Sequence, residues 1–435
     1  MTDLYPEFLD PIETASREYL DRFQEVALIE QVKNGYENAP LIRHLWDKAG
    51  VKPSDIKSIK DFQEKAPLFD KDDQRAFRDQ HHDLTGGFVP IRPGSTMSVG
   101  TTSGTTGDPT PVPNLRRPAS EVAYARAAWY QGSRPGDYLT HLLFTYRGGH
   151  RSRLNKELGW AEIMYAMAPQ EIPRIAEGSR RYRPTSMKIF ASPFILAFEH
   201  YFEQSGDDPV DVFKSYKGVI FGGEALSDRL KGLTESWKIN LFQTTSFGDI
   251  SSANECRMHN GFHTPEDHGF METVDPVTGE PVADGEIGEL VVTMFVDRMM
   301  PLIRFRTGDL VVIDRSKCGC GSTHARFQLL GRATDQIIVE GRSVMPKEVM
   351  TIVENEDESR ASLFQIIRSS REMDVLKVRV GYDPARMKGP EKELRDRLRD
   401  KLRAKIDVPT EVELVDQAEL LKLGPPHKIP RVTKS

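Results

Sequence analysis

Hydrophobic residues along the chain recur with two different periods. Near the N-terminus, Tyr19, Phe23 and Val26 recur at helical spacing. They follow the run Asp10-Pro11-Ile12-Glu13, which offers an N-cap, a proline at the first helical position and a glutamate at the third. We therefore predict a packing helix in this segment. Short apolar runs predict strands at residues 187–191 and 218–221, residues 139–146 are read as a buried strand, and residues 241–247 as another strand.

The strand expected at residues 218–221 ends in Gly222-Gly223-Glu224 and is followed by a helical pattern. This order is typical of a parallel α/β sheet that presents a ligand at its carboxyl edge. After residue 337 the pattern becomes a compact alternation of short strands and helices. We expect strands there at 337–341, 363–368, 375–380 and 410–414 and helices at 346–354 and 392–406.

The C-terminal alternation predicts a small α/β domain of roughly 100 residues. With 435 residues the chain is too long for one compact core. We therefore expect an α/β fold with a large multi-sheet N-terminal domain, residues 1–334, and a small C-terminal α/β domain, residues 335–435, joined by a hinge.

The composition is that of an ordinary water-soluble protein, with 38% hydrophobic residues, 29% charged residues and a formal net charge of −6. This charge gives no general attraction to nucleic acids or anionic membranes, so we expect neither as a partner. No apolar run approaches the roughly 18 residues of a membrane span, and the N-terminus is acidic where a secretion signal would be basic. We expect a cytoplasmic protein.

A run rich in hydroxyl groups and glycine follows residue 101. It consists of Thr102, Ser103, Gly104, Thr105, Thr106 and Gly107, and Asp-Pro comes next. Such a run predicts a loop whose glycines allow close backbone approach and whose hydroxyl and N–H groups can bind a phosphate chain. No lysine follows Gly107, which excludes the ordinary NTPase loop. The alternative, a flexible linker, is disfavoured because the run lies between hydrophobic segments.

This run resembles the phosphate-loop signature of the adenylate-forming enzymes, the acyl- and aryl-CoA ligases. Thr110, where most members carry lysine, resembles the phenylacetate-CoA ligase branch, and further landmarks support that branch along nearly the whole chain. The resemblance implies a large adenylation domain whose loop 102–107 binds the phosphates of ATP with Mg²⁺. It also implies CoA as the second substrate, and the branch implies a homodimer.

Other nucleotide contacts are implied by the same resemblance. Gly222, Gly223 and Glu224 match the adenine-side motif, Phe247-Gly248 the adenine-stacking pair, Asp309 the ribose-binding position and Arg332 a residue that reaches the nucleotide. The family continues after the aromatic-glycine pair with a glutamate that helps to hold Mg²⁺. Here the run Asp249-Ile250-Ser251-Ser252 is shorter and lacks it, which leaves Asp249 or Glu255 as candidate ligands.

The C-terminal end carries four cations and no acidic residue after position 420. It resembles the loop that presents the family's catalytic lysine, and Lys428 fits that position best, with a basic solvated tail as the alternative. The resemblance also implies rotation of the small domain near Asp335, so that one face serves adenylation and another serves thioester formation.

The acid pocket is expected after the strand at 139–146. The resemblance implies that Tyr146, Gly148, Gly149 and His150 help to line it. The chain departs from the family here, because four potential cations lie between Arg147 and Arg153. They indicate either a solvated loop or contact with an anion, such as a second substrate carboxylate or a CoA phosphate.

The three cysteines lie in two segments of the chain, one with Cys256 and the other with Cys318 and Cys320. Cys256, His263, Cys318 and Cys320 form a Cys₃His set suited to tetrahedral Zn²⁺, with His268 and His324 as rival fourth ligands. Four protein ligands leave no open position, so this metal would be structural. Three reduced thiols in packing roles are the alternative.

Together these features predict ATP-dependent activation of an aromatic or arylacetic acid as acyl-AMP and its transfer to CoA. Two alternatives stay open. The acyl group could pass to a carrier-protein thiol or another acceptor. The chain could also be a degenerate homologue that binds a nucleotide without turnover.

Overall fold

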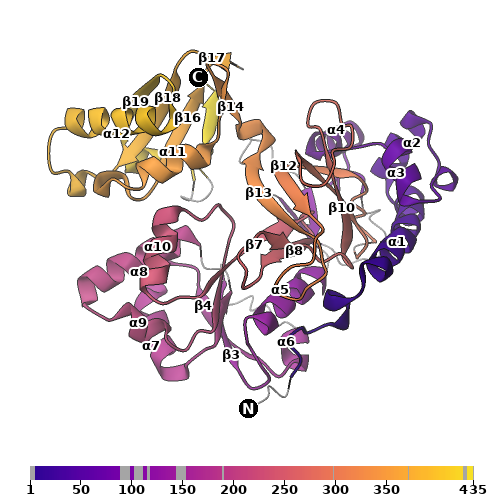
Figure 1. The fold of residues 1–435 in the computed structure, drawn as a ribbon, viewed down its shortest axis with the longest axis horizontal. Coiled ribbons are helices and arrows are strands. Elements are labelled where there is room, and N and C mark those ends of the chain that lie inside the picture. The colour runs from indigo at the N-terminus through magenta and orange to yellow at the C-terminus, as the bar shows by residue number, and fades with distance from the viewer. Residues whose placement is uncertain are drawn as a thin grey trace. The chain divides into compact units, whose positions relative to one another are not determined.

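The computed structural model describes residues 5–88, 98–101, 111–114, 118–143, 153–188, 191–296, 298–370, 372–424 and 429–434 (Figure 1). The chain divides into two units. The first comprises residues 1–137, 150–161 and 242–330, and the second comprises residues 138–149, 162–241 and 331–435.

The first unit begins with helices. They are the 3-10 helices η1 (Pro11–Thr14) and η2 (Pro53–Asp55) and the α-helices α1 (Arg17–Asn38), α2 (Pro40–Ala49), α3 (Ile59–Lys65) and α4 (Lys71–His81). The expected capping pattern is confirmed, but the helix that it begins is the short 3-10 helix η1 and not α1. The Asp10 side chain accepts a hydrogen bond from the Ile12 N–H at 3.2 Å, and the Glu13 side chain accepts one from the Asp10 N–H at 3.0 Å. Helix α1 has its own N-cap, Ser16.

The face of α1 that packs on the core differs from the predicted one. Tyr19 and Val26 are exposed by 56% and 55%, whereas a buried stripe of six residues faces inward. This stripe is Leu20, Gln24, Leu28, Gln31, Val32 and Gly35. Two of its members are glutamines, and their side-chain amides donate to backbone carbonyls: Gln24 to Glu266 and Gly269, and Gln31 to Met294. Because glutamines occupy two core positions of α1, the hydrophobic residues alone do not reveal which face of the helix is buried.

The strands of the first unit are largely antiparallel. Their order is β10 (Gly269–Val274), β11 (Ile287–Met294), β12 (Phe305–Asp314), β13 (Arg326–Arg332), β9 (Phe262–His263), β8 (Ser251–Glu255) and β7 (Leu241–Phe247). Helices α5 (Pro118–Tyr130) and α6 (Arg153–Glu157) complete the unit. Its core joins aromatic residues of the N-terminal helices, such as Trp46 and Phe62, to sheet residues such as Phe327.

A separate pair of strands, β1 (Ser98–Thr101) and β2 (Pro111–Asn114), also belongs to the first unit. The two strands are antiparallel, and Thr101 lies opposite Pro111. The six residues predicted to bind phosphate come between these strands in the sequence and lie outside the described residues.

The second unit contains a parallel sheet with helices packed on it. The strand order is β6 (Gly218–Gly222), β5 (Ser186–Lys188), β3 (Tyr138–Leu143) and β4 (Ala161–Ala166). Figure 1 shows its helices beside these strands. They are η3 (Pro169–Glu171), α7 (Ile172–Tyr182), α8 (Ser192–Ser205), α9 (Pro209–Phe213) and α10 (Asp228–Ser236). The four expected strands are thus confirmed: β7 has the predicted bounds, β6 is one residue longer, and the later residues of the strands predicted at 139–146 and 187–191 fall partly outside the described residues.

The C-terminal part of the second unit has two small sheets. One has the order β15 (Arg342–Val344), β14 (Ile337–Val339), β17 (Glu372–Met373), and the other β19 (Thr410–Asp416), β18 (Leu376–Tyr382), β16 (Phe364–Arg368), β20 (Val432–Lys434). The helical elements are η4 (Ala333–Asp335), α11 (Pro346–Val353), η5 (Asp357–Ser359), η6 (Pro384–Arg386), α12 (Glu391–Ile406) and α13 (Gln417–Leu421). Leu394, Leu398 and Leu402 of α12 pack on Phe364 and Val378.

The alternation predicted for this C-terminal segment is confirmed element by element, and the α/β fold class with it. The division into domains at residues 334 and 335 stays a prediction. No helix in the described part of the chain is both long and apolar enough to cross a membrane.

Candidate active site and metal centre

A cluster of three cysteines and one histidine lies in the first unit. Strand β9 pairs with β8 on one side and with β13 on the other, so His263 lies opposite both Asn254 and Arg326. Cys256 directly follows β8, while Cys318 and Cys320 lie in the segment between β12 and β13. The sheet therefore brings together ligands that are up to 64 residues apart in the sequence.

The distances within this cluster suit a tetrahedral metal. The ligand atoms of Cys256, His263, Cys318 and Cys320 all lie within 4.8 Å of one another. The Sγ atoms of Cys256 and Cys318 are 3.8 Å apart, and the Sγ of Cys320 is 3.6 Å from the Nε2 of His263. Zinc bonds of about 2.3 Å to sulfur and about 2.0–2.1 Å to nitrogen, at tetrahedral angles, imply separations of about 3.8 Å and about 3.6 Å.

The surroundings orient these ligands. The Nδ1 of His263 donates to the carbonyl oxygen of His324 at 3.0 Å, because that oxygen can only accept, and this leaves Nε2 as the coordinating atom. Backbone N–H groups of Met258 and Ser322 approach the sulfurs of Cys256 and Cys320, each at 3.4 Å. Such donors stabilise thiolate ligands.

The two rival histidines have other partners. The Nδ1 of His268 is 2.9 Å from the Ser251 hydroxyl, and the Nε2 of His324 is 3.1 Å from the carbonyl oxygen of Ile12. Burial lowers the pKa of His268 to about 4 and also lowers the pKa of His324. Geometry therefore selects His263 as the fourth member of the set.

The cysteines are buried and free, so the cluster is not a disulfide. A disulfide would place two sulfurs about 2.05 Å apart. Hydrogen bonding from the Cys256 thiol and from His263 lowers the pKa of Cys320, whereas the same contact with Cys320, together with burial, raises the pKa of Cys256. A divalent cation that binds such thiols displaces this shared proton, because cysteine binds a metal as the thiolate.

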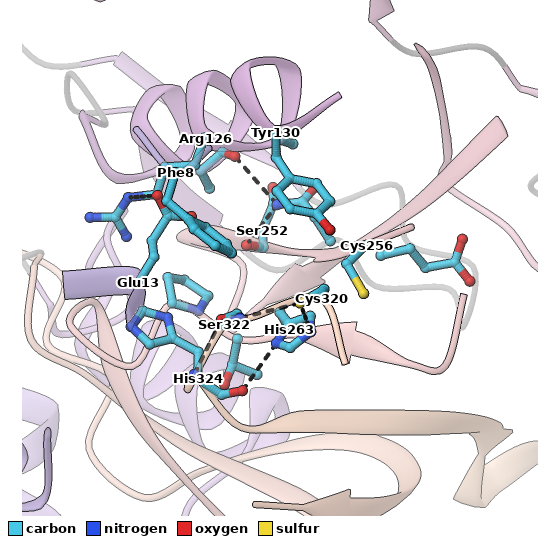
Figure 2. A pocket seen from close by; sticks show the side chains of 16 residues that line it. Phe8, Glu13, Arg126, Tyr130, Ser252, Cys256, His263, Cys320, Ser322 and His324 are labelled. Atoms are coloured by element: carbon cyan, nitrogen blue, oxygen red, sulfur yellow. Dashed lines mark hydrogen bonds and ion pairs between the residues drawn. The ribbon is translucent and has the colours of Figure 1, made fainter. Parts of the chain in front are cut away.

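A pocket of about 60 Å³ adjoins the cluster. Figure 2 shows Arg126 and Tyr130 reaching it from α5, opposite His263 and Cys320. The guanidinium of Arg126 makes a bidentate pair with Asp267, at 2.9 and 2.8 Å, and bonds Asp10 at 2.8 Å. Burial raises the pKa of Glu13, which also lines the pocket, to about 7 against the charge of Arg126.

The N-terminal segment covers this region. The Trp129 indole donates to the Pro6 carbonyl at 2.9 Å, and the ring centroids of Phe8 and Tyr130 are 5.4 Å apart. The Thr323 backbone N–H donates to the Glu13 carbonyl at 3.1 Å. The segment that carries Cys318 and Cys320 thus lies between the sheet and residues 6–13.

The nucleotide residues predicted in the first unit are part of the described chain. Phe247 ends β7 with 0% exposure, its ring packed in the core, so the stacking contact expected for it finds no exposed ring face. Gly248 follows with φ +61°, and a Cβ there would lie 2.9 Å from Met294 Sδ and 2.9 Å from Val292 Cγ2. Asp309, the expected ribose residue, is half-buried on β12.

Both candidate Mg²⁺ ligands after Gly248, Asp249 and Glu255, already interact with other side chains. Asp249 pairs with Lys71 at 2.9 Å. Both oxygens of Glu255 accept from Gln243, one from its backbone N–H at 2.8 Å and the other from its side-chain amide at 2.9 Å. The role of either residue as a Mg²⁺ ligand stays a prediction, and binding of the metal would have to replace these contacts.

The remaining described positions lie in the second unit. Gly222 ends β6, Gly223 has φ +95°, and the Glu224 carboxylate accepts from the Ser192 N–H at 3.1 Å. Burial raises the pKa of Glu224. Burial also raises the pKa of Asp335, the expected pivot, against the charge of Arg332.

Three sets of expected site residues fall outside the described residues. They are Thr102, Ser103, Gly104, Thr105, Thr106 and Gly107 of the phosphate loop, Tyr146, Gly148, Gly149 and His150 of the acid pocket, and Lys428.

Comparison with known proteins decides the family. No family model matches the chain. The phenylacetate-coenzyme A ligase of Pseudomonas putida is 31% identical over 353 residues, which cover 78% of this chain and 77% of that protein. The chain belongs to the phenylacetate-CoA ligase family. The enzyme of the same name from Thermus thermophilus is 29% identical over 355 residues, 79% of this chain and 77% of that protein.

Solved structures agree with this family in fold. A 2-hydroxyisobutyryl-CoA ligase in the postadenylation state, in complex with R3-HIB-AMP, superposes with a TM-score of 0.81 at 22% identity and covers 100% of this chain and 94% of that one. This likeness shows that the chain has the fold of an adenylate-forming CoA ligase.

For this member of the phenylacetate-CoA ligase family, sequence reasoning missed two groups of charged side chains, most of which are buried. One is Arg126 with Asp10 and Asp267, and its only sequence signal was an arginine within the alanine-rich run of α5. The other joins His141, Glu162 and Lys188 on three neighbouring strands. Lys188 did interrupt an apolar run in the sequence, but only the strand order shows what it meets.

Proposed function

We propose that this chain is an ATP-dependent carboxylic acid–CoA ligase that activates an aromatic or arylacetic acid as an acyl-AMP and transfers the acyl group to CoA. The observation that carries the proposal is the similarity to the Pseudomonas putida phenylacetate-coenzyme A ligase over 353 residues. The adenylate-forming loop sequence at residues 102–107 supports it independently.

The first step converts a poor acyl donor into a good one. The substrate carboxylate attacks the α-phosphate of ATP, and pyrophosphate leaves. This reaction needs little covalent help from protein; it needs alignment and positive charge on crowded phosphate oxygens. In this proposal residues 102–107 hold the β- and γ-phosphates, Asp309 binds the ribose hydroxyls, and Lys428 neutralises charge between the carboxylate and the α-phosphate.

In the second step the CoA thiol, as it loses its proton, attacks the acyl carbon, and AMP leaves. To reach the acyl carbon, the thiol needs a path through the place where Lys428 acts in the first step. Rotation of the C-terminal segment near Asp335 supplies that path in this proposal. The raised pKa of Asp335 marks a carboxyl group that burial has taken partly out of water.

The Cys₃His cluster is proposed to hold a structural Zn²⁺. Zinc bound by Cys256, His263, Cys318 and Cys320 supplies cross-linking rather than catalysis, because four protein ligands leave no open coordination position. The metal would fix the end of β8 to the segment between β12 and β13. Strand β8 begins two residues after Asp249, so the metal would also restrain the turn that follows Gly248.

The experiment is to incubate the purified chain with ATP, Mg²⁺ and a panel of carboxylic acids and to measure pyrophosphate and AMP. We expect acid-dependent pyrophosphate release, and AMP release at a multiple-turnover rate only when CoA is added. Rapid turnover with a carrier protein in place of CoA would identify another acceptor. Retention of ATP without release of either product for any acid would identify a non-catalytic homologue.

A further inference from the structure

Charged side chains join residues 331–435, the C-terminal part of the second unit, to helix α8 of the same unit. Arg360, which follows η5, makes a bidentate pair with Glu203 of α8 at 3.0 and 3.1 Å and lies 3.8 Å from Glu199. Arg386 approaches Glu203 at 3.5 Å. The side chains of Arg360 and Glu199 are only 16% and 13% exposed, so this contact is largely withdrawn from water.

A second contact lies at the N-terminus of helix α10. Ser227 is the N-cap of this helix, and the backbone N–H of Arg229 donates to the carboxylate of Glu354 at 3.1 Å. Glu354 follows α11 in the C-terminal part and is only 2% exposed. Burial raises the pKa of Glu354, and hydrogen bonds from Ser227 and Arg229 oppose that rise. The free N–H groups of a helix N-terminus favour such a carboxylate.

These contacts lie beside the expected nucleotide site. Ser227 comes three positions after Glu224 of the adenine-side motif, and Arg431 comes three positions after Lys428. Burial raises the pKa of Glu224, and the charge of Arg431 opposes that rise. Burial lowers the pKa of Arg431, and the charge of Glu224 opposes that fall. The two groups are therefore within electrostatic range of each other in the conformation that makes the contacts of Arg360 and Glu354.

Apolar packing contributes little to the two contacts. In the described residues, Phe198 of α8 and Leu230 of α10 belong to one hydrophobic cluster, and Val349 and Val353 of α11 belong to another. Permanent interfaces usually bury a shared hydrophobic core, whereas contacts that form and break are more polar. Separation of the C-terminal part from α8 and α10 would expose charges that water can solvate. The contacts therefore suit a reversible association.

We propose that Arg360 and Glu354 are positioning residues for adenylation, which dock the C-terminal part on α8 and α10 so that Lys428 acts at the α-phosphate. The proposal rests on the ligase function and on the rotation near Asp335 proposed above. Loss of a docking contact lowers the fraction of molecules in the adenylation conformation, so it slows the first step specifically. A residue needed only for folding would affect both steps.

The half-reactions test this role. Arg360→Met leaves Glu203 largely in water and leaves Glu199 paired with Arg229, so no buried carboxylate loses its only partner. We expect acid-dependent ATP–pyrophosphate exchange to fall by about tenfold, because bidentate charged pairs are among the stronger polar contacts. Thioester formation from synthetic acyl-AMP and CoA should persist. Arg360→Lys keeps the charge and should restore part of the exchange, and Glu354→Gln should lower exchange less than Arg360→Met.

Arg379→Met is the matched control. It removes an arginine of β18 that pairs with Glu413 of β19 at 2.9 Å in the same part of the chain, and both half-reactions should keep their wild-type rates. Denaturant titration compares the stability of all variants. Equal loss of the two half-reactions in Arg360→Met, or exchange at the wild-type rate, would overturn the proposal.

A cross-link tests the docked conformation directly. Glu203→Cys/Arg360→Cys is treated with a short bismaleimide, and the wild-type chain is the control because its own cysteines are buried. The link replaces the ion pair, so the linked protein should keep pyrophosphate exchange and lose thioester formation. The opposite pattern, or two positions that do not cross-link, would overturn the proposal.

The rate of cross-linking separates this inference from the function on which it rests, because it needs no turnover. CoA together with a non-hydrolysable acyl-AMP analogue should slow cross-linking, since thioester formation requires the undocked conformation. A non-hydrolysable ATP analogue should not slow it. Equal rates with the two sets of ligands would overturn the docking proposal, whereas the absence of pyrophosphate release with every acid would overturn the ligase function alone.

Discussion

The imidazole of His263 donates its Nδ1 hydrogen to the carbonyl oxygen of His324 at 3.0 Å. This bond fixes the tautomer and directs Nε2 to the three cysteine sulfurs, of which Cys320 is 3.6 Å away. A second partner of this kind is typical of metal-binding histidines. The arrangement gives the Cys₃His cluster the form of a metal site that is ready to bind.

Zinc content follows from this geometry. Protein purified without added metal should contain about one zinc ion per chain by elemental analysis. Cys320→Ser and His263→Ala should retain much less zinc and unfold at lower denaturant concentration, because metal-binding free energy contributes to folding. His268→Gln is the control, since His268 bonds Ser251 instead, and it should keep the metal. Full loss of zinc in His268→Gln, with retention in His263→Ala, would contradict the ligand set.

Gly248 is expected to tolerate no side chain. Its φ of +61° disfavours any L-residue, and the Cβ of alanine would press on Met294 and Val292 at 2.9 Å. Backbone strain and overpacking together should cost about 2–4 kcal/mol in the free energy of unfolding. The control Gly285→Ala, also at positive φ but with no atom within 4 Å, should cost only about 1–2 kcal/mol. Denaturant titration compares them, and equal losses would contradict the packing around Gly248.

Stability above neutral pH should depend on Glu13. Burial raises its pKa from 4.5 to about 7 in the folded state, so the folded chain holds this proton at a pH at which the unfolded chain has lost it. Stability from this group is therefore complete below about pH 4.5 and is lost as the pH rises through 7, by up to about 3 kcal/mol.

Glu13→Gln keeps the oxygen that accepts from the Asp10 N–H but cannot ionise. It should lessen the fall in unfolding free energy between pH 5 and pH 8, as followed by denaturant titration. Glu18→Gln, a change on the first turn of α1, serves as the control and should follow the wild-type profile. Identical profiles for Glu13→Gln and wild type would show that the carboxylate stays solvated.

Lys428 should act in one half-reaction only. Lys428→Ala is expected to lower acid-dependent ATP–pyrophosphate exchange by about 10²–10³-fold, the usual effect of removing one charge-stabilising donor. Thioester formation from synthetic acyl-AMP and CoA should persist. Lys434→Ala, another cation of the same C-terminal end, should leave both activities intact. Equal loss of both half-reactions in Lys428→Ala would contradict the assignment.

Local sequence patterns predicted the elements of this fold well, and they failed where polar residues enter the core. Local patterns located β3, β5, β6 and β7; β5 and β6 are buried throughout, whereas β7 is only partly buried. The period of α1 was misread because Gln24 and Gln31 occupy core positions, where backbone carbonyls satisfy their amides. Such a partner lies more than 200 residues away in the sequence, so the helix alone could not reveal it.

The cluster of Cys256, His263, Cys318 and Cys320 could be predicted as a set, because cysteine and histidine are rare and their spacing is informative. The choice of His263 over His268 could not, since it depends on the pairing of β9 with β8 and β13. The group of His141, Glu162 and Lys188 was likewise invisible, because adjacent strands bring it together. Burial of the Phe247 ring also depends on distant chain segments, among them Gly269.

The central claim is that this chain joins an organic acid to CoA at the expense of ATP. The most direct test is mass spectrometry of the products formed from an aromatic or arylacetic acid, ATP, Mg²⁺ and CoA. The account predicts an acyl-CoA thioester, with AMP in equal amount and none when the acid is omitted. Unchanged CoA and ATP with every acid of the panel, from protein shown to be folded and zinc-loaded, would contradict it.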